Sequence, residues 1–185
     1  MRTILMAAAA MLVFACTPAE EAETMSAGCD ARAATTWAAR DATFSIEAAT
    51  VGPDCERAVA TIVLRDSSGA PVYAAAYATQ TVMVLAEARD TAAMQAALQG
   101  WTNPAANTIM QTSSALPDWP ANATGPQSGE FPFYPEEGYD REGYMSLRAA
   151  DLPLFCYVQG MESQACLAAS GDGSVTKIGV QTFPG

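Results

Sequence analysis

Five cysteines limit the folds open to this chain of 185 residues: Cys16, Cys29, Cys55, Cys156 and Cys166. In an exported protein, an odd number leaves one thiol over after the others have paired. The chain contains no histidine and no Cys-x-x-Cys pair, so the usual Cys/His zinc spacings cannot be built. We therefore expect disulfides rather than a metal site, and no cofactor.

The first sixteen residues account for the odd cysteine. Met1–Thr3 carry one positive charge, and the uncharged run Ile4–Phe14 has the length of a signal-peptide core but is too short to span a bilayer. The run ends in Val13-Phe14-Ala15-Cys16, with an aliphatic residue three positions before the cysteine and a small one just before it. This ending resembles the lipobox of bacterial lipoproteins, although Phe14 is bulkier than the residue usually found there.

The resemblance implies cleavage before Cys16 and lipidation of the Cys16 thiol and its new amino group. Residues 1–15 would then be the signal peptide. Thr17 stands where an aspartate is used for inner-membrane retention, so the resemblance also implies transfer to the outer membrane, where the lipid would hold the protein. An ordinary cleaved signal followed by an incidental cysteine is the alternative.

The residues after Cys16 divide into a tether and a domain. Thr17–Gly28 contains a proline and three glutamates and lacks large apolar residues other than Met25, so it cannot bury enough surface to order itself. We assign residues 16–28 to the lipidated cysteine and a flexible tether. Residues 29–185 are long enough to form a single globular domain with a core of its own.

With Cys16 assigned to the lipid, four cysteines remain, and four cysteines allow three connectivities. We favour Cys29–Cys55 and Cys156–Cys166 because each pair is close in sequence and brackets a plausible hairpin or strand pair. In the chain-entropy treatment each bridge would stabilise the fold by about 3 kcal/mol.

The pattern of apolar residues predicts an α+β domain: an antiparallel sheet of hairpins with one packed helix and a long irregular segment. Alternation or β-branched runs, separated by Gly-containing turns, predict strands. These strands are Thr43–Ala48, Arg57–Arg65, Pro71–Thr79, Leu154–Gln159, Gln164–Ala169 and Ser174–Thr182. A hairpin centred on Met161 would place Cys156 opposite Cys166.

One helix is predicted from Met94, Ala97, Leu98 and Trp101, which share one helical face. Asp90 is its expected N-cap, and Gly100 lies near its expected C-terminal end. Before it, residues 81–86 (TVMVLA) fit either a strand or the start of a helix, and their β-branched beginning favours a strand.

Prolines set residues 103–143 apart. Seven of the eleven prolines lie between positions 104 and 153. Such a density is incompatible with regular helix or central strand. We expect a long irregular excursion with short strands at most, and loops of this length are usually functional or mobile.

Charge excludes one class of partner. The formal net charge is −11, and Lys177 is the only lysine. Nucleic-acid binding depends on neutralising phosphates with Lys and Arg, so we expect no nucleic-acid partner. No basic patch is available to grip anionic lipid either, so membrane association would depend on the lipid at Cys16.

Enzymatic activity has little support in the sequence, and we leave it open while favouring a protein that is not an enzyme. Without histidine, Ser-His-Asp and Cys-His pairs are excluded, and no phosphate-binding or dinucleotide-binding motif is present. A Ser170–Lys177 pair matches no known motif, and Asp172 lies in a turn that lacks the ligands of a calcium loop.

The irregular segment carries the remaining candidates. Carboxylates and aromatic rings cluster in it and just after it: Asp118, Glu130, Glu136, Glu137, Asp140 and Glu142 with Trp119, Phe131, Phe133, Tyr134, Tyr139 and Tyr144. Tyr and Trp are enriched at binding hot spots, and loops carry binding more often than core faces do. Our candidate partner contacts are Trp119, Tyr134, Glu136, Glu137 and Tyr139.

Three functions fit this segment. The favoured one is a lipid-anchored envelope protein that binds an envelope protein or glycan. The second is a hydrolase of envelope glycans, which would need two carboxyl groups at a fixed separation in a cleft. The third is a purely structural lipoprotein, in which the rings only attach the segment to the core.

Overall fold

The computed structural model describes residues 28–106, 110–127 and 129–183, and the cleavage and lipidation site predicted at Cys16 lies outside them. Within these ranges the chain forms eight strands, three α-helices and two short 3₁₀ helices. In chain order they are β1 (Arg32–Ala39), β2 (Ala42–Val51), β3 (Val59–Arg65), β4 (Pro71–Ala78), η1 (Thr79–Thr81), α1 (Met83–Ala86), α2 (Thr91–Trp101), η2 (Ser113–Ala115), β5 (Phe133–Pro135), α3 (Arg141–Ala149), β6 (Leu154–Val158), β7 (Ser163–Ala169) and β8 (Val175–Thr182).

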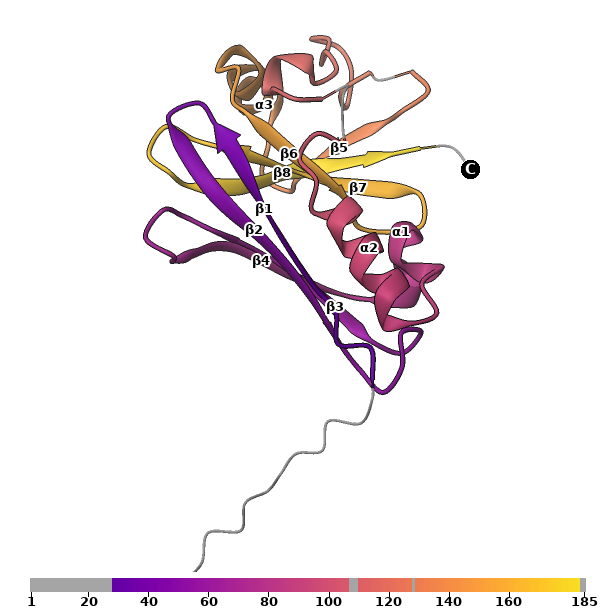
Figure 1. The fold of residues 1–185 in the computed structure, drawn as a ribbon. Helices are drawn as coiled ribbons and strands as arrows, with labels where there is room; N and C mark the ends of the chain where they lie inside the picture. Colours follow the sequence, from indigo (N-terminus) through magenta and orange to yellow (C-terminus); the bar gives the residue numbers. More distant parts are fainter. Residues whose placement is uncertain (1–27, 107–109, 128, 184–185) are drawn as a thin grey trace, which may run out of the picture.

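The strands form two antiparallel sheets (Figure 1). The first sheet is a meander in the order β1-β2-β3-β4, and the second has the order β5-β8-β7-β6. The predicted α+β class, with antiparallel hairpins and a long Pro-rich irregular segment, is confirmed, but the strands divide between two sheets.

The first sheet is buried on one face only. Along β2, Phe44, Ile46 and Ala48 are buried, while the residues between them are more exposed. This period-two alternation is typical of an antiparallel sheet with one solvated face. Its hydrophobic face packs against the second sheet to form the first core, which α2 completes with Met94 and Leu98.

The second sheet is buried on both faces. Along β6 the side chains alternate between two cores: Phe155 and Tyr157 belong to the first core, whereas Leu154 and Cys156 belong to a second core on the opposite face. The irregular segment and α3 cover this opposite face (Figure 1). The second sheet is therefore the middle layer of the molecule.

Three tyrosines connect the two sheets through their hydroxyl groups. The Tyr157 hydroxyl lies 2.8 Å from those of both Tyr73 and Tyr77, which come from β4. Burial raises the pKa of Tyr77 to about 12 and that of the more deeply buried Tyr157 further, so both of these hydroxyl groups stay protonated at neutral pH.

Both predicted disulfides are present. Cys29–Cys55 joins the start of the described chain to the loop between β2 and β3, and Cys156–Cys166 joins directly opposed residues of β6 and β7. The connectivity that we favoured from the sequence is confirmed.

The predicted helix is confirmed, with Gly100 near its C-terminal end, but glycine does not form the cap. Asp90 caps α2, since its carboxylate accepts a hydrogen bond from the Ala93 N–H at 2.8 Å. Gly100 lies inside the helix rather than in a left-handed cap, and the Thr102 N–H closes the last turn on the Leu98 carbonyl.

The preferred strand at residues 81–86 is wrong. Thr79–Thr81 form η1 and Met83–Ala86 form α1, because Val82 and Leu85, three positions apart, both bury their side chains completely. Two further elements, β1 and α3, were not predicted. Alanine gives β1 little contrast between its faces, and α3 begins inside the segment that the prolines mark as irregular.

Candidate functional site

The five residues predicted as partner contacts line one cavity of about 480 Å³. We call it the aromatic cavity; Trp119, residues 124–126 and residues 132–139 form its wall. The aromatic side chains among the five are Trp119, Tyr134 and Tyr139, and the acidic ones are Glu136 and Glu137. The structure therefore brings together residues that are up to twenty positions apart (139 − 119).

Strand β5 positions one wall of the cavity. It pairs with β8, with Tyr134 opposite Val180 and Pro135 opposite Gly179. Because side chains alternate along a strand, Phe133 is buried in the second core while Tyr134 is 58% exposed. A side chain on Gly179 would collide with the Tyr134 carbonyl oxygen and with the Phe133 ring, the latter at 2.6 Å, so this position needs glycine.

Trp119 is held in place from several sides. Its ring packs edge-on against Tyr144 with ring centroids 5.5 Å apart, and its indole N–H donates to the Ala123 carbonyl at 3.0 Å. The Arg141 guanidinium donates to the Trp119 carbonyl oxygen at 2.7 Å. The indole is thus a half-buried, pre-positioned part of the wall, and it also contributes to the second core.

Tyr139 has a similar double role. It packs against the second core, and its backbone N–H donates to the Glu136 carbonyl across the turn that contains Gly138. Burial, and secondarily the negative charge of Glu136, raises the pKa of the Tyr139 hydroxyl. Tyr139 therefore presents a neutral ring and a hydroxyl donor at physiological pH.

The two glutamates of the cavity differ in their partners. Glu136 forms an ion pair with Lys177, at 2.7 Å between Oε1 and Nζ, and its backbone N–H donates to the Ile178 carbonyl. Glu137 is exposed and has no ion pair or hydrogen bond among the described residues. The sequence did not predict that Lys177 pairs with Glu136, because nothing local links β8 to the residues after β5.

The other four carboxylates of the segment do not line the cavity. Asp118 pairs with Arg148 at 3.1 Å, and Asp140 caps α3 by accepting from the Gly143 N–H at 2.8 Å. Glu142 lies in the first turn of α3, where a negative charge is favourable, and Glu130 is exposed. At least Asp118, Asp140 and Glu142 thus have roles in holding the fold.

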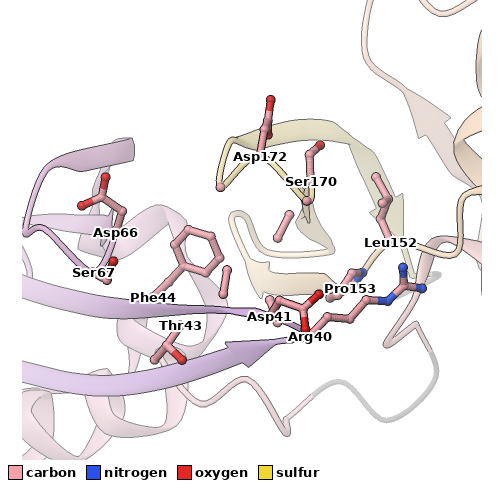
Figure 2. Close-up of a pocket in the computed structure, with 15 residues that line it drawn as sticks. Arg40, Asp41, Thr43, Phe44, Asp66, Ser67, Leu152, Pro153, Ser170 and Asp172 are labelled. Atoms are coloured by element: carbon pink, nitrogen blue, oxygen red, sulfur yellow. The ribbon is translucent and has the colours of Figure 1, made fainter.

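A second cavity, of about 500 Å³, lies where the turns at one end of the two sheets meet (Figure 2). We call it the end cleft. Asp66 and Ser67 lie on one side of Phe44, and Arg40 and Asp41 lie on the other.

The aspartates of the end cleft are engaged in their own turns. Asp66 Oδ1 accepts from the Ser68 hydroxyl and from the N–H groups of Ser68 and Ala70. Asp172 Oδ1 accepts from the Ser174 hydroxyl and N–H. The serine hydroxyl is the main cause that lowers the pKa of each carboxyl, followed by backbone hydrogen bonds. These contacts make both residues turn-formers.

Arg40 and Asp151 connect the two sheets beside the end cleft. The Arg40 guanidinium donates to the Asp151 carbonyl and, at 3.1 Å, to its carboxylate. Both residues have positive φ angles, of 52° and 50°, which are uncommon outside glycine. Because the two residues bind each other across the sheets, the contact has a clear structural role.

No group of three or more His, Cys, Asp or Glu side chains in the described ranges is placed to hold a metal ion. None of the helices in the same part of the chain is long and apolar enough to cross a bilayer. Comparison with protein-family models, with curated protein sequences and with solved structures gave no match.

Proposed function

We propose that this protein is a lipid-anchored binding module of the bacterial cell envelope, held at the outer membrane through Cys16, with the aromatic cavity as its partner site. One observation carries the binding role: an exposed tyrosine, two half-buried rings and the Glu137 carboxylate, which has no partner among the described residues, line one cavity. Concave sites that combine aromatic side chains with a few polar groups are typical of ligand binding, and an envelope protein or glycan is the partner that we propose.

The cavity supports binding better than glycan hydrolysis. A glycosidase needs two carboxyl groups on opposite sides of the scissile bond. The two carboxylates here are neighbours in sequence, and Lys177 already neutralises Glu136. We therefore favour binding without catalysis.

Anchoring is tested by the Cys16→Ser variant. Loss of the thiol removes the site of lipidation, so we expect no acyl labelling and a shift of the protein from the membrane to the soluble fraction. Fractionation in high salt, with labelled palmitate, makes the measurement. A variant that stays in the membrane fraction would contradict the anchor.

Partner binding is tested by affinity capture from the protein's own envelope with Tyr134→Ala. Because the Tyr134 side chain is 58% exposed, the substitution should weaken capture at least tenfold while changing the melting temperature by less than about 2 °C. Phe131→Ala is the control, since Phe131 is also exposed, at 39%, and does not line the cavity. Equal capture by both variants would refute the site.

A further inference from the structure

We infer that the aromatic cavity recognises an arginine side chain on a protein partner. The inference rests on the proposed function, because it names the chemical group that the proposed site would bind. Of the two partner classes, the inference favours a basic protein segment over a glycan.

The charge of the cavity wall favours a cation. Its charged side chains are Glu136 and Glu137, and among the described residues that line it there is no lysine or arginine. The net charge of the whole chain is −11, so its long-range field also attracts cations and repels anions.

One cation of the chain already forms an ion pair with a glutamate of the cavity wall. The Lys177 ammonium is bound by Glu136 at 2.7 Å, so one carboxylate of the adjacent pair is neutralised from within the chain. Glu137 has no such ion pair among the described residues, so its negative charge is available to a ligand. A guanidinium fits this need because it can donate two parallel hydrogen bonds to one carboxylate.

The rings supply the second half of the recognition. Trp119, Tyr134 and Tyr139 line the same cavity as Glu137, and cations, arginine above all, are attracted to the faces of such rings. Trp119 and Tyr139 are fixed against the second core, so the site is largely formed before a ligand arrives. A neutral sugar could stack on the rings, but it would gain no attraction from the charge of Glu137.

The test uses the full-length protein in non-ionic detergent and two short peptides, acetyl-Gly-Arg-Gly-amide and the same peptide with citrulline. Citrulline keeps the shape of arginine and lacks its charge. Binding is followed by NMR through the indole N–H signal of Trp119. We expect saturable shifts with the arginine peptide and at least tenfold weaker binding of the citrulline peptide.

Variants assign the effect to one carboxylate. Glu137→Gln should weaken binding of the arginine peptide about tenfold and remove the preference over citrulline. Glu130→Gln, which removes the same charge from an exposed site outside the cavity, should leave both affinities unchanged. Equal binding of the two peptides, or unchanged binding by Glu137→Gln, would overturn the inference.

Failure of the inference and failure of the proposed function give different results. If a neutral oligosaccharide such as chitohexaose shifts the Trp119 signal and the arginine peptide does not, the arginine inference is overturned and the binding site stands. The same holds if neither probe binds but Tyr134→Ala still abolishes capture of the envelope partner. If neither probe binds and Tyr134→Ala captures as well as the unmodified protein, both are refuted.

Discussion

The two sheets of this protein differ in how many of their faces are buried. The first sheet buries one face and leaves the other to solvent, so its sequence alternates and its outer face carries small and polar residues such as Ala34, Thr36 and Thr61. The second sheet is covered on both faces, so all of Leu154, Phe155, Cys156 and Tyr157 are buried. The added layer over the second sheet is the irregular segment with α3, which also forms the aromatic cavity.

The layer over the second sheet also bears on the proposed function. A loop that only covered a sheet could be short, but this one buries Leu116 and Phe133 while it exposes Tyr134 and Glu137. The same segment thus completes the second core and supplies the proposed partner site. The first sheet contributes nothing to the wall of the aromatic cavity.

The largest expected effect tests whether both faces of the second sheet are true cores. Leu167 faces the first core and Ile178 the second, and both are fully buried. Leu167→Ala and Ile178→Ala should each lower the free energy of unfolding by about 2–5 kcal/mol, through lost burial and the cavity left behind. Val63→Ala, on the outer face of the first sheet, should cost about 1 kcal/mol or less.

Urea unfolding followed by circular dichroism measures all three variants. If Ile178→Ala cost no more than Val63→Ala, the layer over the second sheet would contribute little to stability. The two sheets would then be energetically alike, contrary to the comparison above.

A smaller effect distinguishes the disulfides of the two sheets. The Cys29–Cys55 bridge spans a sequence separation of 26 and Cys156–Cys166 one of 10. In the chain-entropy treatment, double alanine variants should lose about 3.5 and about 2.8 kcal/mol respectively. Denaturant titration tests the order; a larger loss for C156A/C166A would mean that packing of the bridge in the second core outweighs loop closure.

The smallest effect compares the turns of the two sheets. Asp66 in the β3–β4 turn and Asp172 in the β7–β8 turn both have a carboxyl pKa below its ordinary value. A lowered folded-state pKa means that the charged form stabilises the fold at every pH above the unfolded value of about 3.9, and that this contribution is lost as the pH falls through the lower folded value.

Asp66→Asn and Asp172→Asn should therefore each reduce the drop in melting temperature between pH 5 and pH 2.5, by small and similar amounts. Glu130→Asn, at an exposed site, is the control. Scanning calorimetry at the two pH values makes the measurement. A drop identical to that of the unmodified protein in both variants would show that these hydrogen bonds are equally present in the unfolded chain.

The difference between the two sheets also determined which of their features could be predicted from the sequence. Alternation through Phe44 and Ile46 predicted a strand of the first sheet because one face is wet. The apolar run within Leu154–Gln159 predicted a strand, but it did not show that two different layers would cover the two faces of that strand. The paired cysteines gave the correct connectivity because both bridges join neighbouring parts of the chain.

The residues of the candidate site could be named from the sequence, but their assembly could not. Tyr134 is brought to the cavity by the pairing of β5 with β8, more than forty residues further on (Val180 opposite Tyr134). Such a long-range pairing leaves no local signal over three residues. The ion pair between Glu136 and Lys177 depends on the same pairing and was missed for the same reason.

The contact between β5 and β8 depends on one residue, Gly179. Since the Pro135–Gly179 pairing leaves no room for a side chain on β8, the contact of β5 with β8 exists only while that position carries a hydrogen atom. Phe133 and Tyr134 lie on opposite faces of the same short strand, so a shift of this strand changes the packing of the second core and the shape of the aromatic cavity together. A substitution that reshapes the aromatic cavity by moving β5 therefore also disturbs the cover of the middle sheet.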